Sequence, residues 1–117
     1  MEILKESDYY ILENGEIRAV DGAEYRAWRL GESPAMSKRR IAQDFVNGVE
    51  ISTVFAGSNP IYVTGEGPVL FETLVFGGEL DMHGEKSVTL EQARSTHDKY
   101  VAMVRALDGV LNPPDHK

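Results

Sequence analysis

Cysteine is absent from the 117-residue sequence. Its absence excludes disulfide bonds, thiolate metal sites and thiol nucleophiles, and it is typical of proteins in a reducing compartment. Long apolar runs are absent too, since none approaches the roughly 20 residues of a membrane-spanning helix. The opening segment MEILKESDYY lacks the basic region and apolar stretch of a signal peptide. We therefore expect no secretion and no membrane contact, and predict a cytoplasmic location.

Positive charge is scarce, since 12 lysine and arginine residues stand against 19 aspartate and glutamate residues, giving a formal net charge of −7. Phosphate backbones and anionic membranes repel such a molecule, so we expect no direct nucleic acid binding. The adjacent residues Lys38, Arg39 and Arg40 are a local exception. They form either the solvated start of a strand or a small cationic contact patch on an acidic body.

Recognisable catalytic motifs are also missing. No Ser or Thr lies in a nucleophile elbow, and there is no His-Glu-x-x-His pair. Gly65 and Gly67 precede a strand-like segment rather than a helix, which is the wrong context for a phosphate-binding loop. We therefore predict a protein that is not an enzyme and that uses no cofactor.

The composition that remains is that of one folded domain. A length of 117 residues with 42% hydrophobic residues fits a single core of ordinary size. We place one α+β domain at residues 1–111 and a frayed tail at residues 112–117, because the tail is polar and proline-rich. A domain this small leaves much of its surface exposed, so we also expect a homo-oligomer.

Two Asn-Gly dipeptides, Asn14-Gly15 and Asn47-Gly48, predict β-hairpins. Both central positions of a type I′ turn need positive φ, which these residues tolerate best. The strands expected on either side cover residues 9–12 and 17–20 for the first hairpin, and residues 40–46 and 49–56 for the second.

A short helix is expected over residues 23–30, with Asp21 as its N-terminal cap and Gly31 as its stop. A loop should follow over residues 32–37, because Pro34 disfavours helix in the residue before it.

The clearest helix follows the capping box Thr89–Gln92. Apolar residues at helical spacing run from Leu90 to Leu107, and Gly109 is expected to end the helix. The predicted fold is therefore an antiparallel sheet of about five or six strands, with this C-terminal helix packed on one face and the short helix near an edge.

Residues 69–76 are apolar on both faces, which predicts a central strand covered on both sides. Glu72 lies within this strand, so its carboxylate must reach solvent, find a cation such as Arg39 or Arg40, or carry a raised pKa. It is either a paired or rim-exposed glutamate or a residue that contacts a ligand. The glycine pair after Phe76 indicates either a plain turn or a close backbone approach to a ligand.

The glycine- and proline-rich connection over residues 57–68 has Ile61 and Tyr62 near its centre. These apolar side chains either contact a partner or fold back on the core. The candidate partner- or ligand-binding residues are thus Arg39, Arg40, Ile61, Tyr62, Glu72, Phe76, Gly77 and Gly78.

Metal binding and acid–base chemistry are the alternatives. Asp81, His83 and Glu85 alternate, so an extended segment would point them to one side as metal ligands; a short acidic loop is the simpler interpretation. His97 lies on the apolar stripe of the last helix, where a packed, hydrogen-bonded histidine is the usual outcome. An enzyme would instead use Glu72 and His97 as an acid–base pair, and would need both side chains in one cavity.

Three phrases of the sequence, taken together, resemble a family of small uncharacterised bacteriophage and prophage proteins. They are Tyr10-Ile11-Leu12 with Val20-Asp21, the segment GVEISTVF at residues 48–55, and the segment LFETLVFGG at residues 70–78. The chain departs from the family pattern at residues 56–59, where AGSN replaces a Gly-Leu-Asp-His-like stretch. The resemblance implies a phage or prophage origin and action in the cytoplasm of a bacterial host cell.

Three function classes follow. The first is a non-enzymatic binding protein that acts on a host protein or sequesters a small anionic metabolite such as a signalling nucleotide, as in counter-defence. The second is a structural or assembly module that oligomerises. The third is a small enzyme built on Glu72 and His97.

Overall fold

The computed structural model describes residues 7–30, 32 and 38–111, with side chains as far as residue 107. The predicted helix stop at Gly31, the loop over residues 32–37 apart from Glu32, and the tail at residues 112–117 lie outside the described residues.

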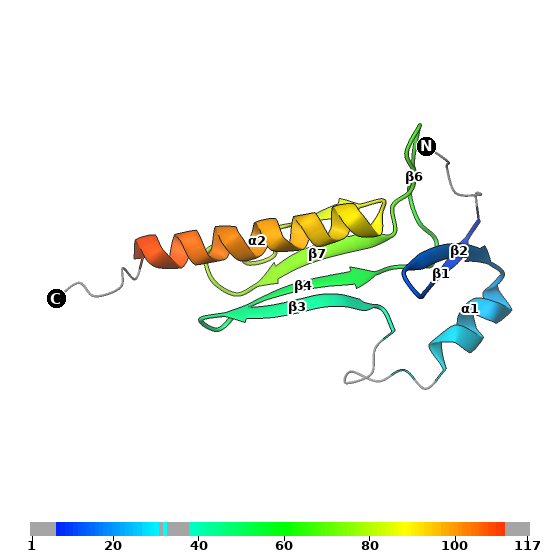
Figure 1. Cartoon of the computed structure of the whole chain (residues 1–117), viewed down its shortest axis with the longest axis horizontal. Helices are drawn as coiled ribbons and strands as arrows, with labels where there is room; N and C mark the ends of the chain where they lie inside the picture. Colours follow the sequence, from blue (N-terminus) through cyan, green and yellow to red (C-terminus); the bar gives the residue numbers. More distant parts are fainter. Residues whose placement is uncertain (1–6, 31, 33–37, 112–117) are drawn as a thin grey trace.

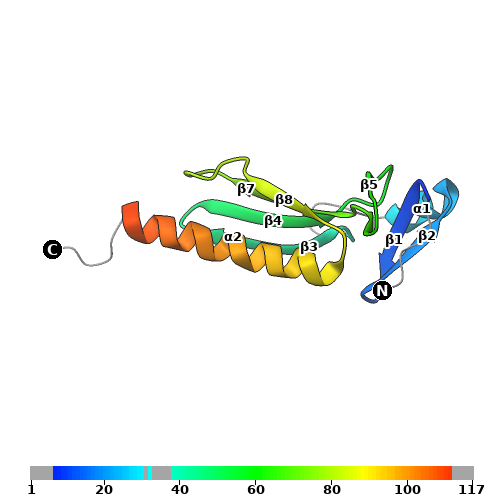
Figure 2. The same cartoon turned by 90° about the horizontal axis from the view of Figure 1, so that it is seen from above.

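A four-stranded antiparallel sheet and a long helix form the centre of the molecule. In spatial order the strands are β3 (Arg40–Val46), β4 (Val49–Phe55), β7 (Phe71–Phe76) and β8 (Gly84–Ser87). Helix α2 (Leu90–Leu111) contacts all four strands and lies along one face of the sheet (Figure 1, Figure 2). The α+β class, the antiparallel pairing, the central position of β7 and the covering C-terminal helix are therefore confirmed. The prediction that this strand is covered on both sides is wrong, because in the described structure α2 covers one face and alternate residues of β7 on the other face stay partly exposed.

The remaining elements lie at one end of this sheet (Figure 1). They are the hairpin of β1 (Tyr9–Glu13) and β2 (Glu16–Val20), the helix α1 (Gly22–Arg29), and the small hairpin of β5 (Tyr62–Val63) and β6 (Gly67–Pro68). Within the described residues the strands thus divide into sheets of four, two and two, where one sheet of five or six was predicted. The hairpins join the main sheet through isolated contacts, such as Tyr10 N–H donating to Gly57 O at 2.7 Å, and do not extend its ladder.

Both predicted hairpin turns are confirmed. Asn14 and Gly15 have φ of 52° and 81°, and Asn47 and Gly48 have φ of 49° and 84°. Positive φ at both central positions matches the twist of the flanking strands. The dipeptides therefore fix the registers of β1 with β2 and of β3 with β4.

The predicted helix starts are also confirmed. Glu24 N–H donates to Asp21 Oδ1 at 2.8 Å at the start of α1. At the start of α2, Gln92 N–H donates to Thr89 Oγ1 at 3.1 Å, and Gln92 Oε1 accepts from Thr89 N–H at 3.3 Å.

The predicted end of α2 at Gly109 is wrong, because the helix continues to Leu111. A glycine inside a helix costs about 1 kcal/mol relative to alanine, which weakens the helix without ending it. In the described part of the chain, no helix has the length and apolar character needed to cross a membrane.

A chain of aromatic rings joins the end elements to the core of the main sheet. The ring centroids of Tyr25 and Trp28 are 6.0 Å apart, those of Trp28 and Phe55 are 5.8 Å apart, and those of Phe55 and Phe71 are 5.4 Å apart. Such pairs contribute about 0.5–1.5 kcal/mol each beyond the area they bury. The contacts therefore fasten α1 to the end of the sheet.

Candidate functional site: the open face of the sheet

The two faces of the main sheet differ sharply in exposure. Alternate residues of β4 and β7 are buried beneath α2, namely Ile51, Thr53, Phe55, Phe71, Thr73 and Val75. The residues between them point to the opposite face, which no helix of the described chain covers (Figure 2). We call this uncovered surface the open face.

The strand registers place the residues of the open face in rows across the sheet. One row consists of Arg40, Val54, Glu72 and Lys86, and the row at the other end consists of Phe45, Glu50 and Phe76. Phe45 is 66% exposed and Phe76 is 39% exposed. Glu50 Oε2 accepts a hydrogen bond from Gln43 Nε2 at 2.7 Å. The face thus presents apolar rings at one end and charges of both signs at the other.

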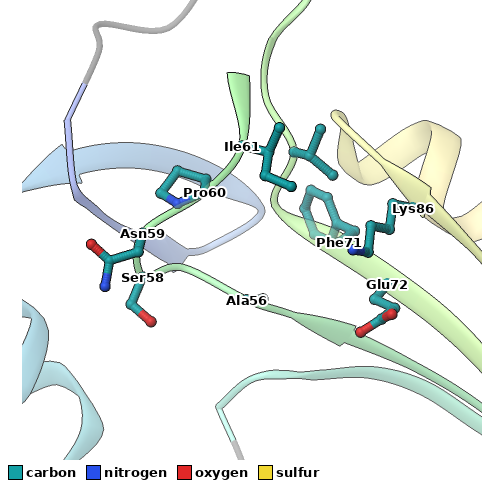
Figure 3. A pocket seen from close by; sticks show the side chains of 9 residues that line it. Ala56, Ser58, Asn59, Pro60, Ile61, Phe71, Glu72 and Lys86 are labelled. Atoms are coloured by element: carbon teal, nitrogen blue, oxygen red, sulfur yellow. The ribbon is translucent and has the colours of Figure 1, made fainter. Parts of the chain in front are cut away.

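A notch of about 170 Å³ lies at the charged end of the open face (Figure 3). It is lined by Ala56, Ser58, Asn59, Pro60, Ile61, Val69, Phe71, Glu72 and Lys86. Ile61 is 65% exposed. Glu72 and Lys86 are cross-strand neighbours, yet among the described residues neither side chain has a hydrogen bond or ion pair. The notch therefore combines an apolar wall with two opposite charges that have no partner within the described part of the chain.

Tyr62 was predicted to contact a partner, but its hydroxyl forms hydrogen bonds within the fold. Its hydroxyl accepts from Ser7 N–H and donates to Ser7 O, and it lies 2.6 Å from the Tyr10 hydroxyl. Because the single Tyr62 proton goes to Ser7, Tyr10 is the donor in the tyrosine pair. The alternative in which residue 62 folds back on the core is thus the one observed, whereas its neighbour Ile61 points outward.

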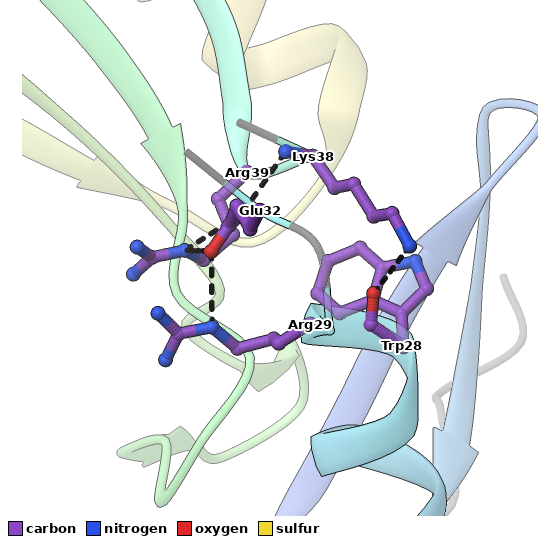
Figure 4. A network of polar contacts seen from close by, with 5 residues as sticks. All are labelled: Trp28, Arg29, Glu32, Lys38 and Arg39. Carbon is purple, nitrogen blue, oxygen red and sulfur yellow. Dashed lines mark hydrogen bonds and ion pairs between the residues drawn. The ribbon is translucent and has the colours of Figure 1, made fainter. Parts of the chain in front are cut away.

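Arg39 belongs to a polar network apart from the open face (Figure 4). Its Nε lies 3.1 and 3.2 Å from the two carboxylate oxygens of Glu32, and Arg29 Nε lies 3.1 Å from the same carboxylate. The hydrogen bond that Arg29 donates to Glu32 raises the pKa of Arg29 above its ordinary value. Lys38 N–H also donates to Glu32, at 3.0 Å. The predicted cationic patch is therefore partly neutralised by one carboxylate whose side chain is only 8% exposed.

Gly77 and Gly78 form the turn after β7. Their φ values are 99° and 70°, and Gly77 N–H donates to Asp81 Oδ1 at 2.7 Å. This turn begins five residues beyond Glu72 along the strand, which corresponds to roughly 17 Å. The predicted residues thus separate: Arg40, Glu72 and Phe76 share the open face and Ile61 borders it, whereas Arg39 and Tyr62 bind elsewhere and the glycines make a plain turn.

The acid–base pair of Glu72 and His97 does not form. Glu72 lies on the open face, whereas His97 is 2% exposed between the sheet and α2. The two side chains are on opposite faces of the sheet and share no cavity. The geometry that an enzyme built on this pair requires is therefore not present in the described structure.

His97 instead bridges α2 to two strands of the sheet. Its Nε2 lies 2.8 Å from Asp44 Oδ2, its Nδ1 lies 2.8 Å from Thr53 Oγ1, and Thr53 Oγ1 lies 2.6 Å from Thr73 Oγ1. The order carboxylate, imidazole, hydroxyl is that of a nucleophilic triad. Thr53 is 0% exposed, so no substrate reaches its hydroxyl in this structure. The cluster therefore serves to hold the helix on the sheet.

Asp81, His83 and Glu85 do not point to one side as an extended segment would require. Met82 has a φ of 66°, which breaks the alternation. Asp81 accepts from Gly77 N–H, and Glu85 turns toward Lys99 and Tyr100 on the covered face. No three potential metal ligands gather anywhere in the described part of the chain.

Sequence reasoning missed two residues of this surface, Phe45 and Lys86. Phe45 alternates with Asp44 and Val46, which point to the face of β3 that α2 covers, and that alternation was the available signal. Lys86 carries no comparable signal, because its position opposite Glu72 depends on the register of β7 with β8. That register is a tertiary property.

Comparison with protein-family models, with curated proteins and with solved structures finds no match to this chain.

Proposed function

We propose that this chain is a phage- or prophage-encoded, non-enzymatic binding protein that acts on a host protein in the bacterial cytoplasm, as in counter-defence. The notch beside Ile61 carries the proposal. The partner inserts one apolar side chain into the notch, and its neighbouring polar groups pair with Glu72 and Lys86.

The size of the notch favours a protein over a nucleotide. Pockets for small ligands usually enclose about 300–1,000 Å³. The notch offers about 170 Å³, close to the ~150 Å³ cavity that holds one benzene ring. A single aromatic or aliphatic side chain fits this volume, and a nucleotide does not. Anchors of this kind, buried in small pockets, dominate the energetics of many protein interfaces.

The chemistry of the rim adds specificity. Glu72 and Lys86 lie side by side, and neither side chain has a hydrogen bond or ion pair among the described residues, so each is available to a group of opposite charge. The remainder of the molecule is acidic, with a formal net charge of −7. A basic host protein is therefore attracted over long range, and the association should weaken as salt rises.

The test is affinity capture from infected host lysate, followed by native mass spectrometry. The tagged wild-type chain is compared with Ile61→Asp, which places a charge at the notch. Met82→Asp is the matched control, because Met82 is 63% exposed and lies at the far end of β7.

The proposal expects a host protein that is retained by the wild type and by Met82→Asp and is lost with Ile61→Asp. Retention that Ile61→Asp leaves unchanged, or no retained host protein, would contradict it. A retained metabolite without a protein would instead favour sequestration of a signalling nucleotide.

An assembly module that oligomerises is the second candidate function. The exposed rings of Phe45 and Phe76 favour it, because they lie on the open face away from the notch. It expects self-association with no host protein in the same capture experiment.

A further inference from the structure

We propose that the open face packs against the open face of a second copy of the chain. The two copies are related by a two-fold axis that lies between the two faces, parallel to β4 and directly above it; we call this the axis along β4. This inference does not depend on the identity of a host partner. It concerns what covers the open face when no host protein is bound.

The charge of the open face suits a second copy of the same chain. The open face carries two positively charged residues, Arg40 and Lys86, and two negatively charged residues, Glu50 and Glu72. Arg40, Glu50 and Glu72 lie inside the proposed overlap and sum to −1, and Lys86 at its margin balances them, on a chain whose formal net charge is −7. Two copies that meet here avoid the repulsion that acts between their other surfaces.

The strand registers select the position of the axis. In a two-fold interface, if residue i meets residue j, then j also meets i. An axis along β4 exchanges the positions of β3 and β7, because these strands flank it on either side. Arg40 of one copy then faces Glu72 of the other, and Phe45 faces Phe76 in the same reciprocal way.

Other two-fold axes parallel to the strands bring together residues that are less complementary in charge or leave a ring uncovered. An axis between β4 and β7 places Arg40 opposite Lys86, and an axis along β7 places Glu72 opposite itself. An axis between β7 and β8 pairs Glu72 with Lys86, but it leaves Phe45 uncovered. The axis along β4 alone joins opposite charges and covers both rings.

One contact in this arrangement is unfavourable. Glu50 lies on β4 in the row of the two rings, so the axis brings the two Glu50 carboxylates together. Like charges in opposition weaken an interface. Removal of this charge should therefore strengthen the dimer, which is an uncommon direction for an interface substitution.

The overlap is small. Three strands at ~4.8 Å spacing and about six residues at ~3.4 Å rise give each copy a flat footprint of roughly 300 Å². Stable interfaces bury about 800 Å² per partner. The dimer is therefore expected to dissociate readily on dilution. Strand β8 lies outside the overlap, which leaves Lys86 and the adjoining notch at the margin of the interface in both copies.

Sedimentation equilibrium of the purified full chain between about 10 μM and 1 mM tests the arrangement, a range that spans weak affinities. The variants are Arg40→Glu, Glu72→Arg, the double exchange, Phe45→Ser and Glu50→Gln. Met103→Ser is the control, because Met103 is as exposed as Phe76 but lies on α2. Urea unfolding of each variant checks that it folds.

We expect each single charge reversal and Phe45→Ser to weaken the dimer by about tenfold or more, and the double exchange to restore it. Glu50→Gln should strengthen it by about threefold or more, and Met103→Ser should change nothing. A wild type that stays monomeric throughout would overturn the inference, as would a double exchange no better than the single reversals. If the chain is monomeric but still captures a host protein through Ile61, the dimer is overturned and the host-binding proposal stands. If the chain forms the dimer but captures no host protein, the host-binding proposal is overturned and the dimer stands.

Discussion

The side-chain oxygens of Thr53 and Thr73 lie 2.6 Å apart across the β4–β7 pair, enclosed between the sheet and α2. Thr53 also contacts His97 Nδ1, so one hydroxyl connects two strands and the helix. Buried polar groups are costly when they lose a partner. The cluster therefore favours one position of α2 on the sheet, the position in which these buried groups keep their partners.

Thr53→Val should destabilise the fold by about 1–3 kcal/mol, because it leaves His97 Nδ1 and the Thr73 hydroxyl without their shared partner. Urea unfolding followed by circular dichroism measures the change. Thr64→Val is the matched control, since Thr64 lies exposed in the β5–β6 turn; it should shift stability by less than about 0.5 kcal/mol. Equal effects of the two substitutions would contradict the role given to Thr53.

Tyr62→Phe should cost about 1–2 kcal/mol, because the hydroxyl joins β5 to Ser7 and Tyr10. Tyr9→Phe is the control, since the Tyr9 hydroxyl has no hydrogen bond among the described residues. Hydrogen exchange at Ser7 and at residues of β5 should accelerate in Tyr62→Phe alone. Unchanged exchange would show that the hydroxyl is dispensable.

Gly57→Ala should be among the most harmful of the small substitutions. A Cβ at this position would lie 2.2 Å from Tyr10 O and 2.7 Å from the Phe55 ring. The clash is relieved if the β1–β2 hairpin moves away from the sheet. We expect this change to lower the free energy of unfolding by about 3 kcal/mol or more. Gly15→Ala, where only the positive φ of 81° matters, should cost about 1–2 kcal/mol. Denaturant midpoints that rank the two in the reverse order would refute the close packing at Gly57.

Glu85 should contribute a pH-dependent part of the stability. Its hydrogen bond from Lys99 lowers its pKa below the usual 4.5. A lowered folded-state pKa means that the stabilisation is complete above the unfolded pKa and is lost as the pH falls through the folded value. The thermal midpoints of wild type and Glu85→Gln should therefore differ at pH 7 and converge below about pH 4. A difference between the two midpoints that is the same at pH 7 and at about pH 3 would contradict the role given to Glu85.

Turns and helix starts were predictable from sequence, because each depends on neighbouring residues. Asn14-Gly15 and Asn47-Gly48 supply the positive φ values of their turns, and Thr89 with Gln92 closes its capping box over three residues. The burial of His97 also followed from its place on an apolar helical stripe. Its partners did not, because Asp44 and Thr53 precede it by 53 and 44 residues.

The candidate site was predicted in part. Ile61 and Glu72 were identified from an apolar loop and from a charge in an apolar strand, and both line the notch. Arg39 and Tyr62 were assigned to the same surface, but hydrogen bonds to Glu32 and Ser7 hold them elsewhere. A side chain's type shows which interactions it can make, whereas the choice among available partners depends on the folded arrangement.

The sequence by itself determined the turns, the helix starts and the alternation that gives each strand of the main sheet two faces, because these depend on backbone dihedrals and contacts within a few residues. The tertiary structure alone decided that the described strands divide into three sheets, that the second face of the main sheet has no helix over it and that Phe45, Glu72 and Lys86 lie on that face. These outcomes depend on which distant segments bury the most surface together, and no local pattern encodes that competition.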